Sequence, residues 1–242
     1  MTKTNSFVKR VVGYFALSGL AMALAPGARA STPEERVDRR TQTALAMDAH
    51  PLKGAESYAR YCERCHGAEA QGDASALIPA LAGQRFAYLV RQLANFAGAE
   101  RESATMHKVA TQAQINEPQS WVDLASYLNN LTPPAETQVG TGEATTLGRV
   151  IFHGQCAACH GRDASGDKAG FVPSLRHQHY DYLNKQIHKL MQGSRHNVDQ
   201  ELVLFMRSFD ERDMRGTADY LSRLKGPGPE HKSMRDNGVV VN

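Results

Sequence analysis

The chain has 242 residues, with 28 basic side chains, 25 acidic side chains and 4 cysteines. Four of the basic residues and none of the acids lie in residues 1–30, so the rest of the chain is close to neutral. Its basic residues are interspersed with acids and form no stripe with aromatic side chains, which argues against nucleic-acid binding. No segment after residue 30 is long and apolar enough to cross a bilayer, so we expect a soluble mature protein.

Residues 1–30 have the three parts of a secretory signal peptide. Basic residues near the start precede an apolar run over residues 11–25, and Ala28-Arg29-Ala30 has the small-residue pattern that signal peptidase cleaves. The apolar run is shorter than the roughly 20 residues that a membrane span needs, although an uncleaved anchor is an alternative. We therefore expect cleavage after Ala30 and a periplasmic protein.

Two Cys-x-x-Cys-His motifs organise the remaining chain. They are Cys62-Glu63-Arg64-Cys65-His66 and Cys156-Ala157-Ala158-Cys159-His160. This spacing is typical of c-type haem attachment, in which two thiols bond to the porphyrin and the adjacent histidine binds the iron. A bare Cys-x-x-Cys is also compatible with a zinc site or a thioredoxin-like redox pair, but the histidine and the repetition favour haem. The motifs use all four cysteines, so we expect two c-type haems and no disulfide.

The motifs belong to an internal repeat with a spacing of 94 residues. Pro79 aligns with Pro173, and residues 81–93 align with residues 175–187 while keeping Leu, Gln, Tyr, Leu and Gln in register. A repeat of this length predicts two copies of one fold. The expected organisation is a signal peptide 1–30, a lightly packed N-terminal extension 31–53, a first domain 54–135, a linker 136–146, a second domain 147–225 and a flexible tail 226–242.

With these motifs the sequence resembles the dihaem cytochrome c4 family, which has two class I cytochrome c domains in tandem. The resemblance rests on the two Cys-x-x-Cys-His-Gly motifs, on the Pro-x-Leu-x-x-Gln-x-x-x-Tyr-Leu-x-x-Gln segments that begin at Pro79 and Pro173, and on closing helices that end in Tyr-Leu. It implies an all-α fold, periplasmic electron transfer and a methionine as the second axial ligand of each iron. It also implies that the carbonyls of Pro79 and Pro173 accept hydrogen bonds from the haem-binding His66 and His160.

The two repeats differ where this methionine is expected. Met106 lies about 20 residues before the Tyr-Leu ending of the first repeat, so we expect it to be the distal ligand, with His107 a weaker rival. In the second repeat Leu202 takes the matching position, and Met206 lies one helical turn later. Met206, His196 or no side chain at all is then the distal ligand of the second iron.

Three further histidines of the second repeat, His177, His179 and His188, are expected at the surface or facing a haem propionate.

In the first repeat, Pro118 fits the first turn of a closing helix, with Asn116 as its cap.

Two functions are compatible with these features. The first is an electron carrier between a bc-type complex or a dehydrogenase and a terminal oxidase or reductase, with no catalytic residue and with membrane association only through its partners. The second is a haem enzyme or enzyme subunit in which an open, five-coordinate second iron acts on a small molecule. The sequence favours the carrier, because it shows no set of acid–base residues around a substrate pocket.

Overall fold

The structure is a computed structural model that describes residues 30–168 and 170–226. The predicted signal peptide and the predicted tail lie outside the described residues, apart from Ala30 and Gly226. Within the described residues, the part from Thr32 onward forms one compact unit. None of the helices in the described ranges combines the length and the apolar character that crossing a bilayer requires.

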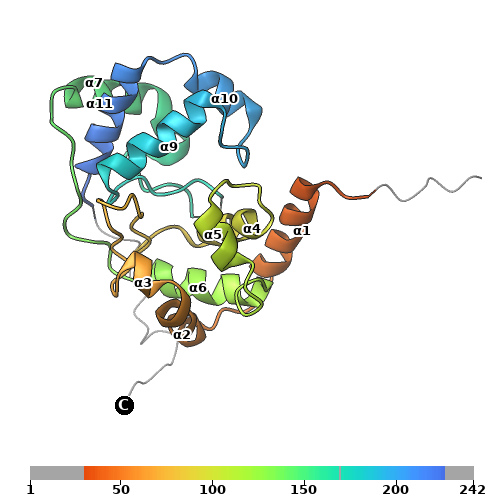
Figure 1. Cartoon of the computed structure of the whole chain (residues 1–242). Coiled ribbons are helices and arrows are strands. Elements are labelled where there is room, and N and C mark those ends of the chain that lie inside the picture. Colours follow the sequence, from red (N-terminus) through yellow and green to blue (C-terminus); the bar gives the residue numbers. More distant parts are fainter. Residues whose placement is uncertain (1–29, 169, 227–242) are drawn as a thin grey trace, which may run out of the picture. The chain divides into compact units, whose positions relative to one another are not determined.

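The described residues fold into helices, and the prediction of an all-α protein is confirmed (Figure 1). The only strand-like pairing described is an isolated bridge between Asp73 and Ile78. The first half of the unit contains α1 (Pro33–Leu45), α2 (Pro51–Tyr61), α3 (Glu63–His66), α4 (Phe86–Ala97), α5 (Ala104–Ala110) and α6 (Pro118–Asn130). The second half contains α7 (Thr145–Ile151), the π-helical segment η1 (Phe152–Cys156), α8 (Ala157–His160), α9 (Tyr180–Gln192), α10 (Gln200–Met206) and α11 (Glu211–Ser222).

Each half has its own hydrophobic core, as expected for two copies of one fold. Tyr58 and Trp121 are fully buried in the first core, and Phe152 and Met214 in the second. In both halves the helix before the Cys-x-x-Cys-His motif packs against the last helix, α2 on α6 and α7 on α11. Burial of these apolar side chains is the main force that holds each half together.

Glycines permit these two helix pairs to cross closely. A Cβ atom on Gly54 would lie 2.0 Å from the carbonyl oxygen of Asp123, and one on Gly148 would lie 1.9 Å from that of Gly216. Gly54 and Gly148 are 94 residues apart, so the repeat has kept the residue that the crossing requires. The crossing holds the start of each haem-binding motif against the closing helix of its half.

The N-terminal helix α1 is part of the first core, so the prediction of a lightly packed extension is wrong. Its Val37 and Ala44 are buried against α4 and α6. The Arg40 guanidinium lies over the Trp121 ring at 4.4 Å and donates to the backbone oxygen of Asn116 at 2.6 Å. Asn116 therefore anchors α1 and is not the cap of α6, whose N-cap residue is Glu117.

The segment between the halves is tied to the second half. The side chain of Gln138 bonds to Asp181, and the Gln138 carbonyl accepts from the Tyr180 N–H. The carboxylate of Asp219, which is 4% exposed, accepts the backbone N–H groups of Gly140 and Gly142. A carboxylate buried in this way supplies partners for backbone groups that would otherwise lack them.

Candidate haem sites

The two motif histidines have the same surroundings. Nδ1 of His66 lies 3.1 Å from the carbonyl oxygen of Pro79, and Nδ1 of His160 lies 3.2 Å from that of Pro173. A carbonyl oxygen only accepts hydrogen bonds, so Nδ1 carries the proton in each ring and Nε2 keeps its lone pair. Burial lowers the pKa of both histidines, against a smaller opposing effect of the proline carbonyls, which favours the neutral imidazole that binds a metal.

No disulfide joins the four cysteines, all of which lie among the described residues. Burial, together with the neighbouring cysteine, raises the pKa of Cys62 to about 12 and that of Cys156 to about 11. Cys65 and Cys159 are exposed, and both precede a histidine whose Nε2 is free to bind iron.

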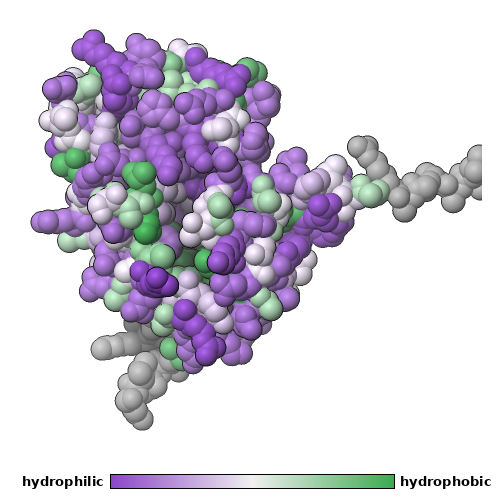
Figure 2. Space-filling view, in the orientation of Figure 1, coloured by the Kyte–Doolittle hydropathy of each residue, from purple (hydrophilic) through white to green (hydrophobic). Residues whose placement is uncertain are grey.

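A cavity of about 500 Å³ lies between the two halves and brings several of these residues together. Cys65, His66 and Met106 line it from the first half, and the second half contributes Pro173 and Leu183 among others. His107 does not line it, and its Nδ1 lies 2.7 Å from the carbonyl oxygen of Phe96. The volume is in the range of cofactor sites. On the face shown in Figure 2 the surface is mostly hydrophilic, and hydrophobic residues gather near its middle.

The structure places Leu202, His196 and Met206 of the second half in different surroundings. Leu202 is 39% exposed, and His196 is exposed as well. Met206 is buried in the second core, in the same cluster as Phe152 and Leu183. Of the two proposed donors, Met206 is the one whose side chain lies inside the half.

His177 and His179 connect parts of the chain, and the expectation that His179 lies at the surface or faces a propionate is wrong. His179 is buried, and its Nε2 lies 2.9 Å from the carbonyl oxygen of Gln71 in the first half while Nδ1 accepts from the Gln138 N–H. His177 takes a left-handed conformation with a φ of 55°, and its Nδ1 lies 3.1 Å from the Pro134 carbonyl oxygen. Both rings serve the packing between segments.

Two arginines on the cavity wall were missed by the sequence analysis. Arg101 is 7% exposed, and it shares the wall with Arg195, Lys185, Lys189 and a single acid, Glu102. The spacing of Arg101 and Arg195 is again 94 residues, which is the signal that could have found them.

Among the described residues, the hydrogen-bond acceptors of these two arginines are uncharged. Arg101 donates to Tyr182 Oη at 2.7 Å and to Gln186 Oε1 at 3.1 Å, and Arg195 donates to Tyr88 Oη and Gln186 Oε1, both at 3.4 Å. Buried or half-buried cations that share neutral acceptors favour an anion beside them. Haem propionates are such anions, so Arg101 and Arg195 on the cavity wall would suit the carboxylates of a bound haem.

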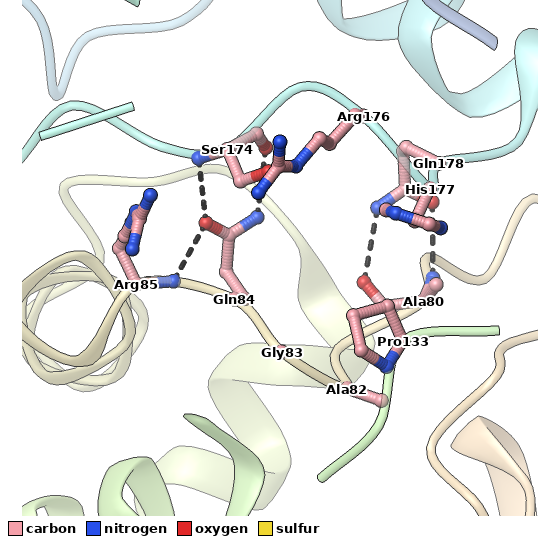
Figure 3. Close-up of a pocket in the computed structure, with 10 residues that line it drawn as sticks. All are labelled: Ala80, Ala82, Gly83, Gln84, Arg85, Pro133, Ser174, Arg176, His177 and Gln178. Atoms are coloured by element: carbon pink, nitrogen blue, oxygen red, sulfur yellow. Dashed lines mark hydrogen bonds between the residues drawn. The ribbon is translucent and has the colours of Figure 1, made fainter. Parts of the chain in front are cut away.

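The interface between the halves also contains two glutamines in matching positions (Figure 3). Gln84 of the first half exchanges two hydrogen bonds with the backbone of Ser174, and Gln178 of the second half does the same with Ala80. The Arg85 N–H also donates to Gln84 Oε1. These contacts join each half to the loop that follows the haem-binding motif of the other.

Comparison with known proteins agrees with this geometry. A family model described as Cytochrome c matches residues 145–225, and one described as Cytochrome C oxidase, cbb3-type, subunit III matches residues 49–128. Cytochrome c4 from Azotobacter vinelandii is 26% identical over 75% of this chain and 93% of its own length. The structure of Acidithiobacillus ferrooxidans cytochrome c4 aligns with a TM-score of 0.58 and 26% identity over 68% of this chain and 99% of that chain.

Each half matches a family model of cytochrome c type, and the similar proteins that span most of the chain include cytochromes c4, which supports a cytochrome c4-like family. The protein is a c-type cytochrome with two c-type haems, and it takes part in electron transfer with other redox proteins. A further similar protein is the thiosulfate dehydrogenase electron acceptor of Stutzerimonas stutzeri, which is 29% identical over 76% of this chain and 88% of its own length. Because both motifs bind c-type haem, the alternatives of a zinc site and a thioredoxin-like redox pair are wrong.

Proposed function

We propose that this cytochrome c4-like protein is a periplasmic electron carrier that accepts electrons from a dehydrogenase and passes them to a terminal oxidase or reductase. The observation that carries the proposal is the cavity shared by the halves, whose wall includes both His66 and Met106. The similarity to a thiosulfate dehydrogenase electron acceptor supports thiosulfate dehydrogenase as the donor. The two haem-binding domains are then residues 54–135 and 147–225.

In this proposal each half holds its haem through two cysteines, the motif histidine and a methionine. When bound, a c-type haem supplies a one-electron couple. The proline carbonyls keep the proton on Nδ1 of each histidine and so direct Nε2 toward the metal. The residues assigned to the cofactor are Cys62, Cys65, His66 and Met106 in the first half and Cys156, Cys159, His160 and Met206 in the second.

The positively charged residues of the cavity wall support a carrier role. Arg101 and Arg195 would balance the carboxylates of a bound haem, and a thioether ligand from Met106 would raise its reduction potential relative to two histidine ligands. A carrier needs no proton-transferring residue at the iron, and docking with a partner depends on complementary surfaces.

The test is reduction of the purified, oxidised protein by thiosulfate dehydrogenase and thiosulfate, followed in the haem α band. We expect both haems to be reduced rapidly, and no reduction when either thiosulfate or the dehydrogenase is omitted. A parallel reaction uses a bc-type complex with quinol. Reduction by that complex alone would contradict the proposed donor, and reduction by neither would contradict the carrier function.

A second candidate function has one observation in its favour, namely that Leu202 is the third residue of α10, the place that Met106 has in α5. If Met206 does not bind the second iron, that iron is open to small molecules. Carbon monoxide added to the reduced protein distinguishes the two cases. Binding by one haem in the wild type would favour the second candidate, whereas binding only after Met206→Leu would support Met206 as the distal ligand.

A further inference from the structure

The peptide group that joins Pro79 to Ala80 makes hydrogen bonds at both of its ends. Its carbonyl oxygen lies 3.1 Å from Nδ1 of His66. Its N–H, on Ala80, donates to Oε1 of Gln178 at 3.0 Å. One amide therefore connects the histidine of the first half to a glutamine of the second half.

The same arrangement exists in the opposite direction. The peptide group that joins Pro173 to Ser174 accepts from Nδ1 of His160 at 3.2 Å, and its N–H donates to Oε1 of Gln84 at 2.8 Å. Gln84 belongs to the first half, so each histidine is connected to a glutamine of the other half. Figure 3 shows the glutamine side of both connections, from Gln84 to Ser174 and from Gln178 to Ala80.

Each glutamine is held in place by further hydrogen bonds. Nε2 of Gln178 donates to the Ala80 carbonyl at 2.9 Å, and Nε2 of Gln84 donates to the Ser174 carbonyl at 3.0 Å. The oxygen of Gln178 also accepts the His179 N–H at 3.1 Å. Gln178 and Ala80 are 7% and 5% exposed, so little water competes at this contact. Hydrogen bonds in such surroundings are electrostatically stronger than in water.

Hydrogen bonds at the two ends of an amide strengthen each other, because donation from the N–H polarises the carbonyl oxygen. A stronger acceptor at Nδ1 makes the histidine a more basic ligand, which stabilises the oxidised iron and lowers its reduction potential. We propose that Gln178 is a positioning residue that lowers the potential of the first haem, and that Gln84 does the same for the second. This inference rests on the proposed roles of His66 and His160 as iron ligands.

The test measures the two reduction potentials by spectroelectrochemical titration of the full-length holoprotein. Gln178→Leu removes the acceptor of the Ala80 N–H, so it should raise the reduction potential of the first haem and leave that of the second haem unchanged. Gln84→Leu should raise only the second. Losing one hydrogen bond should change the equilibrium constant for reduction by up to about tenfold, or about 59 mV. Met106→His identifies the first haem, because a second histidine lowers its potential.

The control is Gln138→Leu, which removes an amide that bonds to Asp181 and to neither peptide group. It should change neither potential. Gln178→Glu offers a carboxylate to the Ala80 N–H and should lower the potential of the first haem, a reversal of sign that mere loosening of the interface would not produce.

The outcomes that overturn the inference are separable from failure of the proposed function. The inference would be overturned if a variant changed the reduction potential of the haem in its own half. It would also be overturned if both potentials changed equally or if neither changed. All three results would leave the carrier role intact. His66→Ala should abolish the low-spin electron paramagnetic resonance signal of the first haem. If that signal persisted, the ligand assignment would be wrong, and the inference with it.

Discussion

Replacing Gly148 by alanine should destabilise the second half through one backbone contact. The added Cβ would lie 1.9 Å from the carbonyl oxygen and 2.2 Å from the carbonyl carbon of Gly216. Both atoms belong to the backbone of α11, so no side chain can rotate to make room, and α7 must move away from α11. That movement separates the start of the second haem-binding motif from the closing helix.

The expected loss in the free energy of unfolding follows from two opposing effects. Overpacking costs about 1–3 kcal/mol in well-packed cores, and a rigid backbone neighbour places this site at the upper end. Alanine recovers up to about 1 kcal/mol through its higher helix propensity. The net loss of about 2 kcal/mol should lower the melting temperature by about 4–8 °C for a unit of this size.

The assay is thermal unfolding of the holoprotein, followed by circular dichroism and by the haem Soret band. Gly154→Ala is the matched control, because a Cβ on Gly154 meets nothing within 4 Å. It should leave the melting temperature unchanged or raise it slightly. If Gly148→Ala and Gly154→Ala unfolded at the same temperature, the close helix crossing would not have the role given to it here.

Three further perturbations test the site and the packing between segments. Arg101→Gln removes a buried positive charge from the cavity wall and should lower a haem reduction potential measured by redox titration, whereas loss of the half-exposed charge in Arg215→Gln should have little effect. Asp219→Ala leaves two backbone N–H groups without their acceptor and should lower the free energy of unfolding by about 2–4 kcal/mol in urea titrations, with the half-buried Asp213→Ala costing less. Met206→Leu should convert the second haem to a high-spin form in electron paramagnetic resonance, and an unchanged spectrum would exclude Met206 as a ligand.

Local sequence patterns predicted much of the fold because they reflect local chemistry. The spacing Cys-x-x-Cys-His predicted the haem motifs, and Pro118 marked the first turn of α6. The burial of α1 was missed because Val37 and Ala44 are too sparse for a clear helical pattern, and their burial depends on α4 and α6. Asn116 was misassigned as a cap because its partner, Arg40, is distant in the sequence.

The sequence by itself determined that this protein has two haem motifs in a repeat of 94 residues, and it showed that the second repeat has no methionine that matches Met106. The tertiary structure decided which halves meet and through which atoms. It placed Arg101 on the wall of a shared cavity and Gln178 against the peptide beside His66. Those contacts join residues about 100 positions apart, and they follow from the packing of whole halves, which no local pattern of side chains encodes.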